Sequence, residues 1–572
     1  MRALFFAPHA GIWVHAFPEA LIADALGDSG IDIVYVTCGG ALSSLCITMA
    51  SRGVAIDSPV AAKQAVCREC MRNRDLLRAD FDFKGYDFES VLTPVDERRI
   101  EELTARPRAV ATFDLDGVAV GRAALYEYLI SKKKSQLEIP DEEWPEFRPR
   151  LANTVRSLLA AQKILDLERP DRVLTYNSLY SVNAMWRAAA DQRGIASYFL
   201  HAGSNLRNRL QTMMLGRDSS LRWYAHLIEA WRDYRDLPCS AGELAAVTDH
   251  FEQLLRGTSV FAYSAAKASE AQDVRARFDV RPEQKLVVAA MSSYDEYVAA
   301  RAIGEMPASP SELFPTQIEW VRALSEHFAK RPDLFLIIRV HPREFPNKRE
   351  GTKSEHAYQL ERAFQALPSN VRVNWPADKL SIYDLAEHAD AFLNAWSTAG
   401  REMALLGLPV VAYCPEMLLY PAELNYVGTT RETYFAAIDK ALRDGWSFER
   451  ARRAFRWSVL ELSRGIANID DGFDLTEHPA SSVFERAVRG VLALPGVRQR
   501  YDLWRRPHRL REAHRLGEAM ICGEPTLVPP PVRTVDEATE TAALRAQFVR
   551  LGRALAGDAP KPNTLGWRLL RS

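Results

Sequence analysis

The chain has 572 residues, 47% hydrophobic and 26% charged, and its 73 basic and 74 acidic residues give a formal net charge of −1 at pH 7. This length exceeds what one hydrophobic core supports, so we expect about two to four domains. The balanced charge excludes a global polyanion-binding role, and we expect no nucleic acid partner. A local basic patch is still compatible with the balanced net charge.

The apolar segments are too short for targeting or membrane insertion. The start, 1–8, has an apolar run shorter than a signal peptide needs and predicts a first strand. No apolar segment approaches the roughly 20 residues that span a bilayer. We therefore expect a cytoplasmic protein whose seven cysteines are free thiols or metal ligands rather than disulfides.

Strand and helix patterns alternate along the chain, which predicts two α/β units with parallel sheets, joined by helices. Lys132 to Lys134, in a helical stretch of the first unit, are expected to be solvated. The expected strands are 4–7, 31–37, 172–176 and 194–200 in the first unit, and 285–290, 334–340, 371–373, 391–393 and 410–413 in the second.

The same pattern suggests five regions. The expected regions are an N-terminal Rossmann-like domain (1–205), a helical connector (206–282), a C-terminal Rossmann-like domain (283–445), an arginine-rich helical region (446–522) and a proline-containing, partly disordered tail (523–572).

Polar residues follow three strands of the second unit. In open parallel sheets, ligands bind beyond the carboxyl ends of the strands, so these loops should meet at one edge. An imidazole, guanidiniums, hydroxyls and helix N–H groups suit a diphosphate or phosphodiester without an added metal, and a carboxylate there could accept hydrogen bonds from ribose hydroxyls. The candidate donor-binding residues are Ser293, Arg339, His341, Arg343, Ser397, Thr398, Gly400 and Glu402. Each motif alone has a simpler interpretation, such as helix capping by Ser397 or Thr398.

Two of these motifs resemble a known family. Arg339-Val-His341-Pro342-Arg343, followed by Trp396-Ser-Thr-x-Gly400-x-Glu402 and then Gly407-x-Pro409, is similar to the donor half of GT-B glycosyltransferases. The resemblance is to the bacterial capsule and surface-polysaccharide group and, more distantly, to polysialyltransferases. It covers 285–415 well and 1–205 only in outline.

The resemblance implies a function and a donor site. In that family the His-Pro and Ser/Thr positions contact the nucleotide phosphate, often of a CMP-activated sugar, which implies donor contacts from His341, Ser397 and Thr398. The expected partners are a nucleotide-sugar donor and a growing or lipid-linked glycan acceptor, with no cofactor required for catalysis. A CDP-glycerol-type polyol-phosphate transferase and a non-catalytic nucleotide- or glycan-binding protein remain alternatives. A dinucleotide oxidoreductase is disfavoured because no Gly-x-Gly-x-x-Gly follows a strand.

The general base should come from the first unit. His9 and His15 follow the first strand, and Asp116 lies in Asp114-Leu-Asp-Gly117, which is similar to an acidic-acidic-Gly motif of polysialyltransferases but has an intervening Leu. A histidine or a carboxylate can deprotonate an acceptor hydroxyl. The alternatives are an Asx-type turn for the aspartates and ordinary loop or packing positions for the histidines.

Two further stretches have their own alternatives. Cys38, Cys46, Cys67 and Cys70 include a Cys-x2-Cys pair, the chelate spacing of structural zinc sites, although free buried thiols fit equally well. The basic, aromatic run 497–515 could rest on an anionic membrane at the inner face, or it is a solvated helix face.

Overall fold

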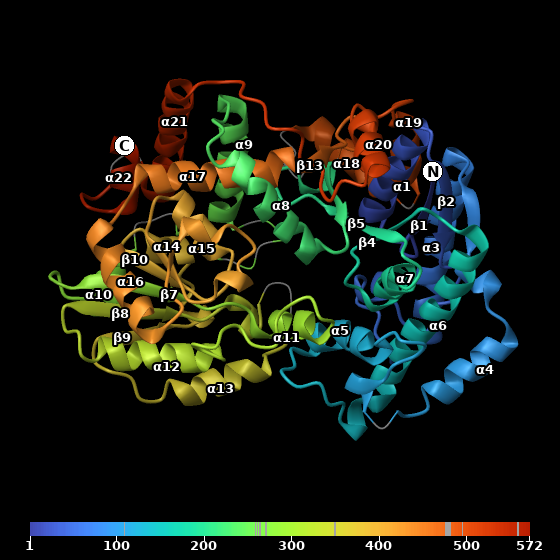
Figure 1. Cartoon of the computed structure of the whole chain (residues 1–572), viewed down its shortest axis with the longest axis horizontal. Helices are drawn as coiled ribbons and strands as arrows, with labels where there is room; N and C mark the ends of the chain where they lie inside the picture. Colours follow the sequence, from blue (N-terminus) through green and yellow to red (C-terminus); the bar gives the residue numbers. More distant parts are fainter. Residues whose placement is uncertain are drawn as a thin grey trace.

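The computed structural model describes residues 1–107, 109–257, 259, 261, 263, 265–268, 272–347, 351–474, 482–494, 496–557 and 560–572. Two α/β domains, each built on a largely or wholly parallel sheet, lie side by side (Figure 1). The predicted fold class, two Rossmann-like domains, is confirmed. Within the described ranges, none of the helices combines the length and the apolar character needed to cross a membrane.

The first sheet has the order β13-β6-β5-β4-β1-β2-β3. Its strands are β1 (Arg2–Phe6), β2 (Asp32–Thr37), β3 (Lys84–Asp87), β4 (Arg172–Tyr176), β5 (Ala196–Ala202), β6 (Thr212–Arg217) and β13 (Ile466–Asn468). Strands β1 to β5 are parallel, β6 is antiparallel to β5, and β13 is antiparallel to β6. This sheet therefore continues past residue 205, where we expected the domain to end, because β6 and β13 cover the edge of β5.

Both faces of the first sheet are buried. Leu4 and Phe6 of β1 pack in the cluster formed with α5, α6 and α7, whereas Ala3 and Phe5 pack in the cluster formed with α1 and α20. Burial on both faces explains why the strand is a continuous apolar run. The helices of this domain are α1 (Trp13–Asp28), α2 (Ile47–Ala50), α3 (Val60–Phe81), α4 (Pro94–Leu103), α5 (Val120–Lys132), α6 (Trp144–Glu168) and α7 (Ser181–Asp191).

The second sheet is wholly parallel and has the order β12-β11-β10-β7-β8-β9. Its strands are β7 (Lys285–Ala290), β8 (Leu334–Arg339), β9 (Val371–Asn374), β10 (Ala391–Asn394), β11 (Val410–Ala412) and β12 (Tyr426–Val427). Its helices are α11 (Tyr294–Ala302), α12 (Gln317–Phe328), α13 (Glu355–Ala363), α14 (Ile382–Ala386), α15 (Ala399–Leu405) and α16 (Arg431–Asp444). In both sheets the strand order reverses beside the first strand, at β1/β4 and at β7/β10, and such switch points form ligand crevices.

The chain crosses between the domains several times. The connecting helices are α8 (Ser220–Tyr234), α9 (Ala241–Arg256), α10 (Val274–Arg277) and α17 (Phe448–Val459), and the C-terminal helices are α18 (Val483–Leu492), α19 (Val497–Arg505), α20 (Ala513–Cys522), α21 (Glu537–Ala556) and α22 (Leu565–Arg571). Helices α19 and α20 contact α3 and α1 of the first domain, whereas α21 returns to α9. Leu544, Phe548 and Leu551 of α21 are fully buried, so this part of the tail is packed helix, whereas 523–536 contain no helix.

The domains also meet where α5 packs against α11 (Figure 1). Lys133, just after α5, is buried, and its Nζ donates to the carbonyl oxygens of Arg343 (2.5 Å) and Thr352 (2.7 Å). The expectation that this lysine is solvated is therefore wrong. Its ammonium instead joins the first domain to the loop after β8.

Candidate functional site

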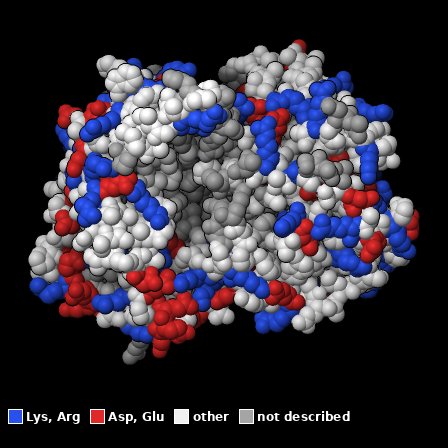
Figure 2. Space-filling view, turned by 180° about the vertical axis from the view of Figure 1, so that it is seen from behind, with Lys and Arg blue, Asp and Glu red and all other residues white. Residues whose placement is uncertain are grey.

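A cavity of about 320 Å³ lies between the two domains. The carboxyl ends of β7, β8 and β10 line one side, and the loop after β5, helices α8 and α9 and a π-helical turn, η9 (Leu460–Arg464), line the other. Figure 2 shows a hollow between the two lobes, with Lys/Arg and Asp/Glu side chains interspersed around it rather than forming a surface of one sign. The polar lining residues are Ser204, Arg209, Tyr224, His250, Tyr263, Arg339, His341, Ser397, Thr398, Arg401, Glu402 and Glu461.

His341 stands directly after β8 at this cavity. Its Nδ1 accepts a hydrogen bond from the backbone N–H of Arg343 (3.3 Å), and its ring lies edge-on to Tyr263. Burial, together with the nearby cations Arg343 and Arg339, lowers the pKa of His341 to about 3. The imidazole is therefore neutral, and because Nδ1 is an acceptor, Nε2 carries the proton and can donate.

Arg339, the last residue of β8, is a buried cation without a carboxylate partner among the described residues. Its side chain is held by Asn374, whose Oδ1 accepts from the guanidinium at 2.5 Å. Burial lowers the pKa of Arg339 to about 10. A buried charge is costly unless an opposite charge compensates it. The cavity therefore holds a positive charge that an anionic ligand would stabilise.

The Ser397 to Gly400 turn is organised by Asn394 at the end of β10. The Asn394 side chain donates to the Ser397 carbonyl (2.9 Å) and accepts from the Ser397 N–H (3.1 Å). The Ser397 hydroxyl accepts from the Ala399 N–H (3.2 Å), as a turn-stabilising serine does, whereas Thr398 is exposed and makes no capping bond. Both side chains nevertheless line the cavity beside His341.

Gly400 is required for packing. A Cβ at this position would lie 2.2 Å from the Tyr420 hydroxyl and 2.3 Å from Asn394 Nδ2. Any side chain would therefore push α15 away from β10. Gly400 does not line the cavity itself, but it allows the Ser397–Thr398 turn to sit where it does.

Two carboxylates lie among these cations. Arg401 of α15 forms a buried ion pair with Glu461 of η9, which joins the second domain to the chain segment that returns to the first sheet. Tyr383 donates to Glu402 (2.8 Å), and burial raises the pKa of Glu402. The Arg401 charge is thus neutralised by an ion pair, whereas Arg339 forms no ion pair among the described residues and interacts with Asp378 and Asp384 only at longer range.

Two predicted donor residues lie elsewhere. Arg343 is fully buried in an ion pair with Asp295 (2.8 Å), and it also donates to the Tyr263 hydroxyl (2.5 Å). Ser293 donates to Glu296 and does not line the cavity. Arg343 therefore holds the two domains and the loops after β7 and β8 together. The sequence could not reveal this, because Asp295 becomes its partner only in the folded sheet.

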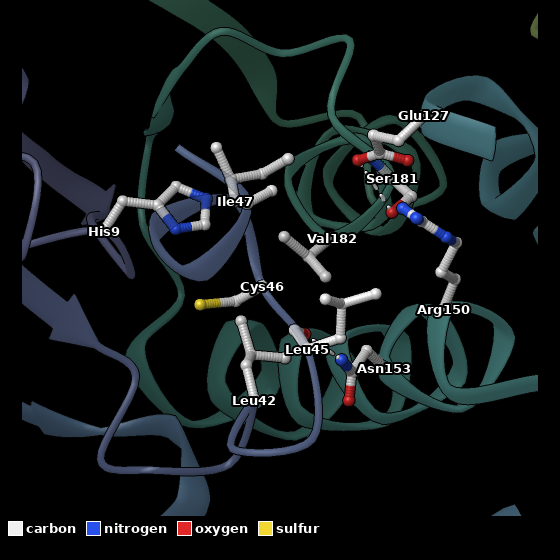
Figure 3. A pocket seen from close by; sticks show the side chains of 11 residues that line it. His9, Leu42, Leu45, Cys46, Ile47, Glu127, Arg150, Asn153, Ser181 and Val182 are labelled. Atoms are coloured by element: carbon white, nitrogen blue, oxygen red, sulfur yellow. Dashed lines mark hydrogen bonds between the residues drawn. The ribbon is translucent and has the colours of Figure 1, made fainter. Parts of the chain in front are cut away.

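A second, smaller pocket of about 40 Å³ lies at the switch point of the first sheet (Figure 3). His9 follows β1 and Ser181 begins α7, and both line it. His9 is buried, and neither of its ring nitrogens has a hydrogen-bond partner among the described residues; the same holds for Glu127 Oε2 and Arg150 Nε. Ser181 donates its N–H (2.7 Å) and its hydroxyl (3.0 Å) to the other Glu127 oxygen. Burial lowers the pKa of His9 to about 3, so it is neutral.

The other two base candidates are not in this pocket. His15, on α1, stacks on Tyr176 (4.5 Å between ring centres), and burial together with Arg209 lowers its pKa to about 4. Asp116 lies in a turn with positive φ, where Gln192 donates to its carbonyl (2.6 Å). Since Gln192 follows the end of α7 opposite to Ser181, Asp116 is at the far edge of the first sheet. Asp114 accepts from the Gly117 N–H (2.8 Å), which is the Asx-type turn of the simpler interpretation.

The four clustered cysteines are free thiols. Cys38 follows β2, Cys46 precedes α2, and Cys67 and Cys70 lie on α3, where the Cys70 sulfur accepts from the Gly11 N–H (3.2 Å). Burial raises the pKa of each thiol, that of Cys70 to about 11. In the described part of the chain, no three or more His, Cys, Asp or Glu side chains form a group that could hold a metal ion. The zinc site stays a prediction.

Four cavity residues with a charged or imidazole side chain were missed from the sequence: Arg209, His250, Arg401 and Glu461. Arg401 stands inside the recognised motif, between Gly400 and Glu402, so it could have been named. The others come from the connector and the returning segment, where no local pattern marks them. His250 accepts from the Leu206 N–H through Nδ1 (3.0 Å), and its Nε2 is buried without a partner among the described residues.

Among the comparisons with known proteins, only the one with solved structures gives matches. No protein-family model matches the sequence, and no curated protein matches it. Solved structures with some likeness include a UDP-GlcNAc 2-epimerase from Neisseria meningitidis bound to UDP-GlcNAc (10% identity, 81% of this chain and 97% of that chain, TM-score 0.23). Another is the glycosyltransferase SnogD from Streptomyces nogalater (13% identity, 81% of this chain and 95% of that chain, TM-score 0.24). A third is the spinosyn rhamnosyltransferase SpnG (12% identity, 80% of this chain and 95% of that chain, TM-score 0.22). These TM-scores are too low to transfer a substrate or a mechanism to this chain.

Proposed function

We propose that the protein is a glycosyltransferase that moves a sugar from a nucleotide-activated donor to a growing surface glycan. The donor nucleotide would occupy the cavity between the domains, held through its phosphate by Arg339, His341 and the Ser397–Thr398 turn. A CMP-activated sugar is the favoured donor, on the sequence motifs alone.

The observation that carries this proposal is the buried charge of Arg339, which has no ion pair among the described residues, beside the neutral His341. Both line one cavity, at the carboxyl edge of the second sheet and next to its switch point. A cation whose described partner is the neutral amide of Asn374 is best satisfied by an anion. A phosphate supplies that charge and can also accept from His341 Nε2.

The same groups suit transfer chemistry. The leaving nucleotide phosphate gains negative charge in the transition state, so fixed donors at Arg339 and His341 would lower the barrier. The acceptor hydroxyl must lose a proton, and His9, neutral and with unpartnered nitrogens at the other switch point, is the base that we assign. At neutral pH the His9 imidazole is unprotonated and can accept a proton.

A nucleotide thermal-shift series tests the proposal. CMP, CDP, UDP and GDP are added separately to the wild-type protein, and at least one should raise the melting temperature. Arg339→Met and His341→Ala should abolish that shift. The matched control Arg322→Gln, on the exposed face of α12 in the same domain, should keep it.

Four results would decide against transfer. If no nucleotide raises the melting temperature, or if Arg339→Met binds as the wild type does, the cavity is not a nucleotide site. Phosphodiester linkages in the product would instead indicate a CDP-glycerol-type polyol-phosphate transferase. Binding without turnover over a panel of donors would indicate a non-catalytic nucleotide-binding protein.

A further inference from the structure

The C-terminal helices α18 and α19 expose large apolar side chains that nothing in the described structure covers. Trp504 is 81% exposed and Val483 is 73% exposed. Val488, Val491, Leu494 and Tyr501 are exposed as well, and Tyr501 lies against Trp504. The two helices lie beside α20 over the first domain (Figure 1). Ordinary surfaces scatter single apolar residues, so a contiguous group of this size marks an interaction surface.

The apolar side chains of α18 fall on one side of the helix. Val483, Val488 and Val491 follow the spacing that produces an apolar stripe, whereas Arg486 and Arg489 lie on the remaining face. An apolar stripe opposed by arginines is the pattern of a helix that lies in the plane of a membrane interface. A helix packed against a protein core would have its stripe buried, which is not the case here.

The same surface carries uncompensated positive charge. Arg486, Arg489, Arg500 and Arg509 are exposed and have no ion-pair partner among the described residues. By contrast, neighbouring Arg506 pairs with Asp24 and Asp80. Exposed Arg511 pairs with Asp470 and Asp471, so the positive charge without an ion pair is that of the four arginines named first.

We propose that α18 and α19 dock the protein on an anionic phospholipid surface. The valines and Trp504 enter the interface between headgroups and acyl chains, and the four outward arginines contact headgroup phosphates. The basic run expected from the sequence is thus only half of the surface, because α18 supplies the apolar stripe. This inference does not depend on the proposed transfer activity.

A second copy of the chain fits this surface less well. A symmetric dimer would bring two copies of this arginine-bearing surface together, and like charges brought together oppose association. A lipid surface accepts exposed valines and a tryptophan without requiring a complementary shape. Both the charge and the missing shape complement therefore favour lipid.

Sedimentation of the full-length protein with vesicles tests the proposal. Phosphatidylcholine vesicles are compared with vesicles that also contain phosphatidylglycerol, and only the anionic vesicles should bind. Trp504→Ser should weaken binding about tenfold, and Arg489→Gln and Arg500→Gln about fivefold each, since a basic residue near an anionic surface contributes about a factor of five. The double control Val95→Ser/Arg98→Gln, on exposed α4, should bind as the wild type does.

Each other outcome counts against the surface. Equal binding to both vesicle types, no binding, or loss of binding in the α4 control would overturn the proposal. Self-association that Trp504→Ser abolishes, measured by analytical ultracentrifugation, would assign the surface to a second copy instead. Nucleotide thermal shifts recorded on the same variants should stay at wild-type values, so failure of this proposal and failure of the transfer proposal are separable.

Discussion

The two sheets place different chemistry at the same topological position. At the switch point of the second sheet, Arg339 and His341 face a cavity of about 320 Å³. At the switch point of the first sheet, His9 and Glu127 face a pocket of about 40 Å³, which holds little more than one water molecule. One half is therefore built for a large anion and the other for a small neutral group such as a hydroxyl.

The two domains also differ in how they are assembled. The strands of the second sheet come from one continuous stretch, whereas the first sheet is completed by β13, which follows the second domain in the sequence. The Arg401–Glu461 ion pair lies where that returning segment passes the cavity. Substitutions on the two sides should therefore separate ligand binding from domain assembly.

The largest expected effect is on stability. Arg401→Met leaves Glu461 buried and unpaired, and breaking a buried ion pair in this way should cost about 3–5 kcal/mol in urea unfolding. Arg256→Met, which breaks an exposed pair with Glu252 on α9, should cost less than about 1 kcal/mol. The double variant Arg401→Met/Glu461→Gln should recover part of the loss. Equal costs for Arg401→Met and Arg256→Met would mean that the pair does not tie the domains together.

The next effect is on catalysis at the second switch point. His341→Ala removes a donor to the leaving phosphate, and the loss of one such donor lowers kcat by about 10²–10³. The free energy of unfolding of this variant, measured in urea, should stay close to that of the wild type. This measurement separates an effect on catalysis from an effect on folding. Full activity in both His341→Ala and Ser397→Ala would remove this edge of the sheet from the mechanism.

A smaller effect separates packing from binding in the motif. Gly400→Ala places a methyl group against Tyr420 and Asn394, and such overpacking should cost about 1–3 kcal/mol. Gly242→Ala on α9 meets no atom within 4 Å and should be neutral or stabilising by up to about 1 kcal/mol. Thermal unfolding of both variants gives the comparison. A stable Gly400→Ala protein that fails to bind nucleotide would instead assign Gly400 to the ligand.

The most gradual effect is a pH dependence shared by both switch points. His9 and His341 have pKa values of about 3 when folded, against an ordinary value of 6.5. The unfolded chain binds more protons below pH 6.5, so their contribution to stability is fully present above pH 6.5 and is lost as the pH falls toward 3. Each contributes a slope of about 1.4 kcal/mol per pH unit.

His9→Leu should reduce that slope in urea unfolding between pH 6.5 and 4.5, and the exposed His508→Gln should leave it unchanged. A bound nucleotide should reduce the contribution of His341 to the slope of unfolding free energy against pH, and it should leave the contribution of His9 unchanged. If it reduces both contributions equally, the two switch points do not differ as proposed.

Much of the architecture was readable from the sequence. Apolar runs separated by segments of helical periodicity predicted most strands of both sheets. The parallel arrangement predicted in addition that the polar ends of β8 and β10 would lie at one edge of the sheet. His341, Ser397 and Thr398 do lie at one cavity. These inferences rest on local pattern and on the geometry of parallel sheets, which neighbouring residues already encode.

Only the tertiary structure decided which polar groups face the ligand and which serve the fold. Arg343 lies close to His341 in the sequence, yet it forms an ion pair with Asp295, whereas Arg339 forms no ion pair among the described residues. The other wall of the cavity, with Arg209, His250 and Glu461, comes from segments distant in sequence. The physical reason is that burial and charge pairing depend on long-range contacts, and these contacts leave no signal in the local pattern of residues.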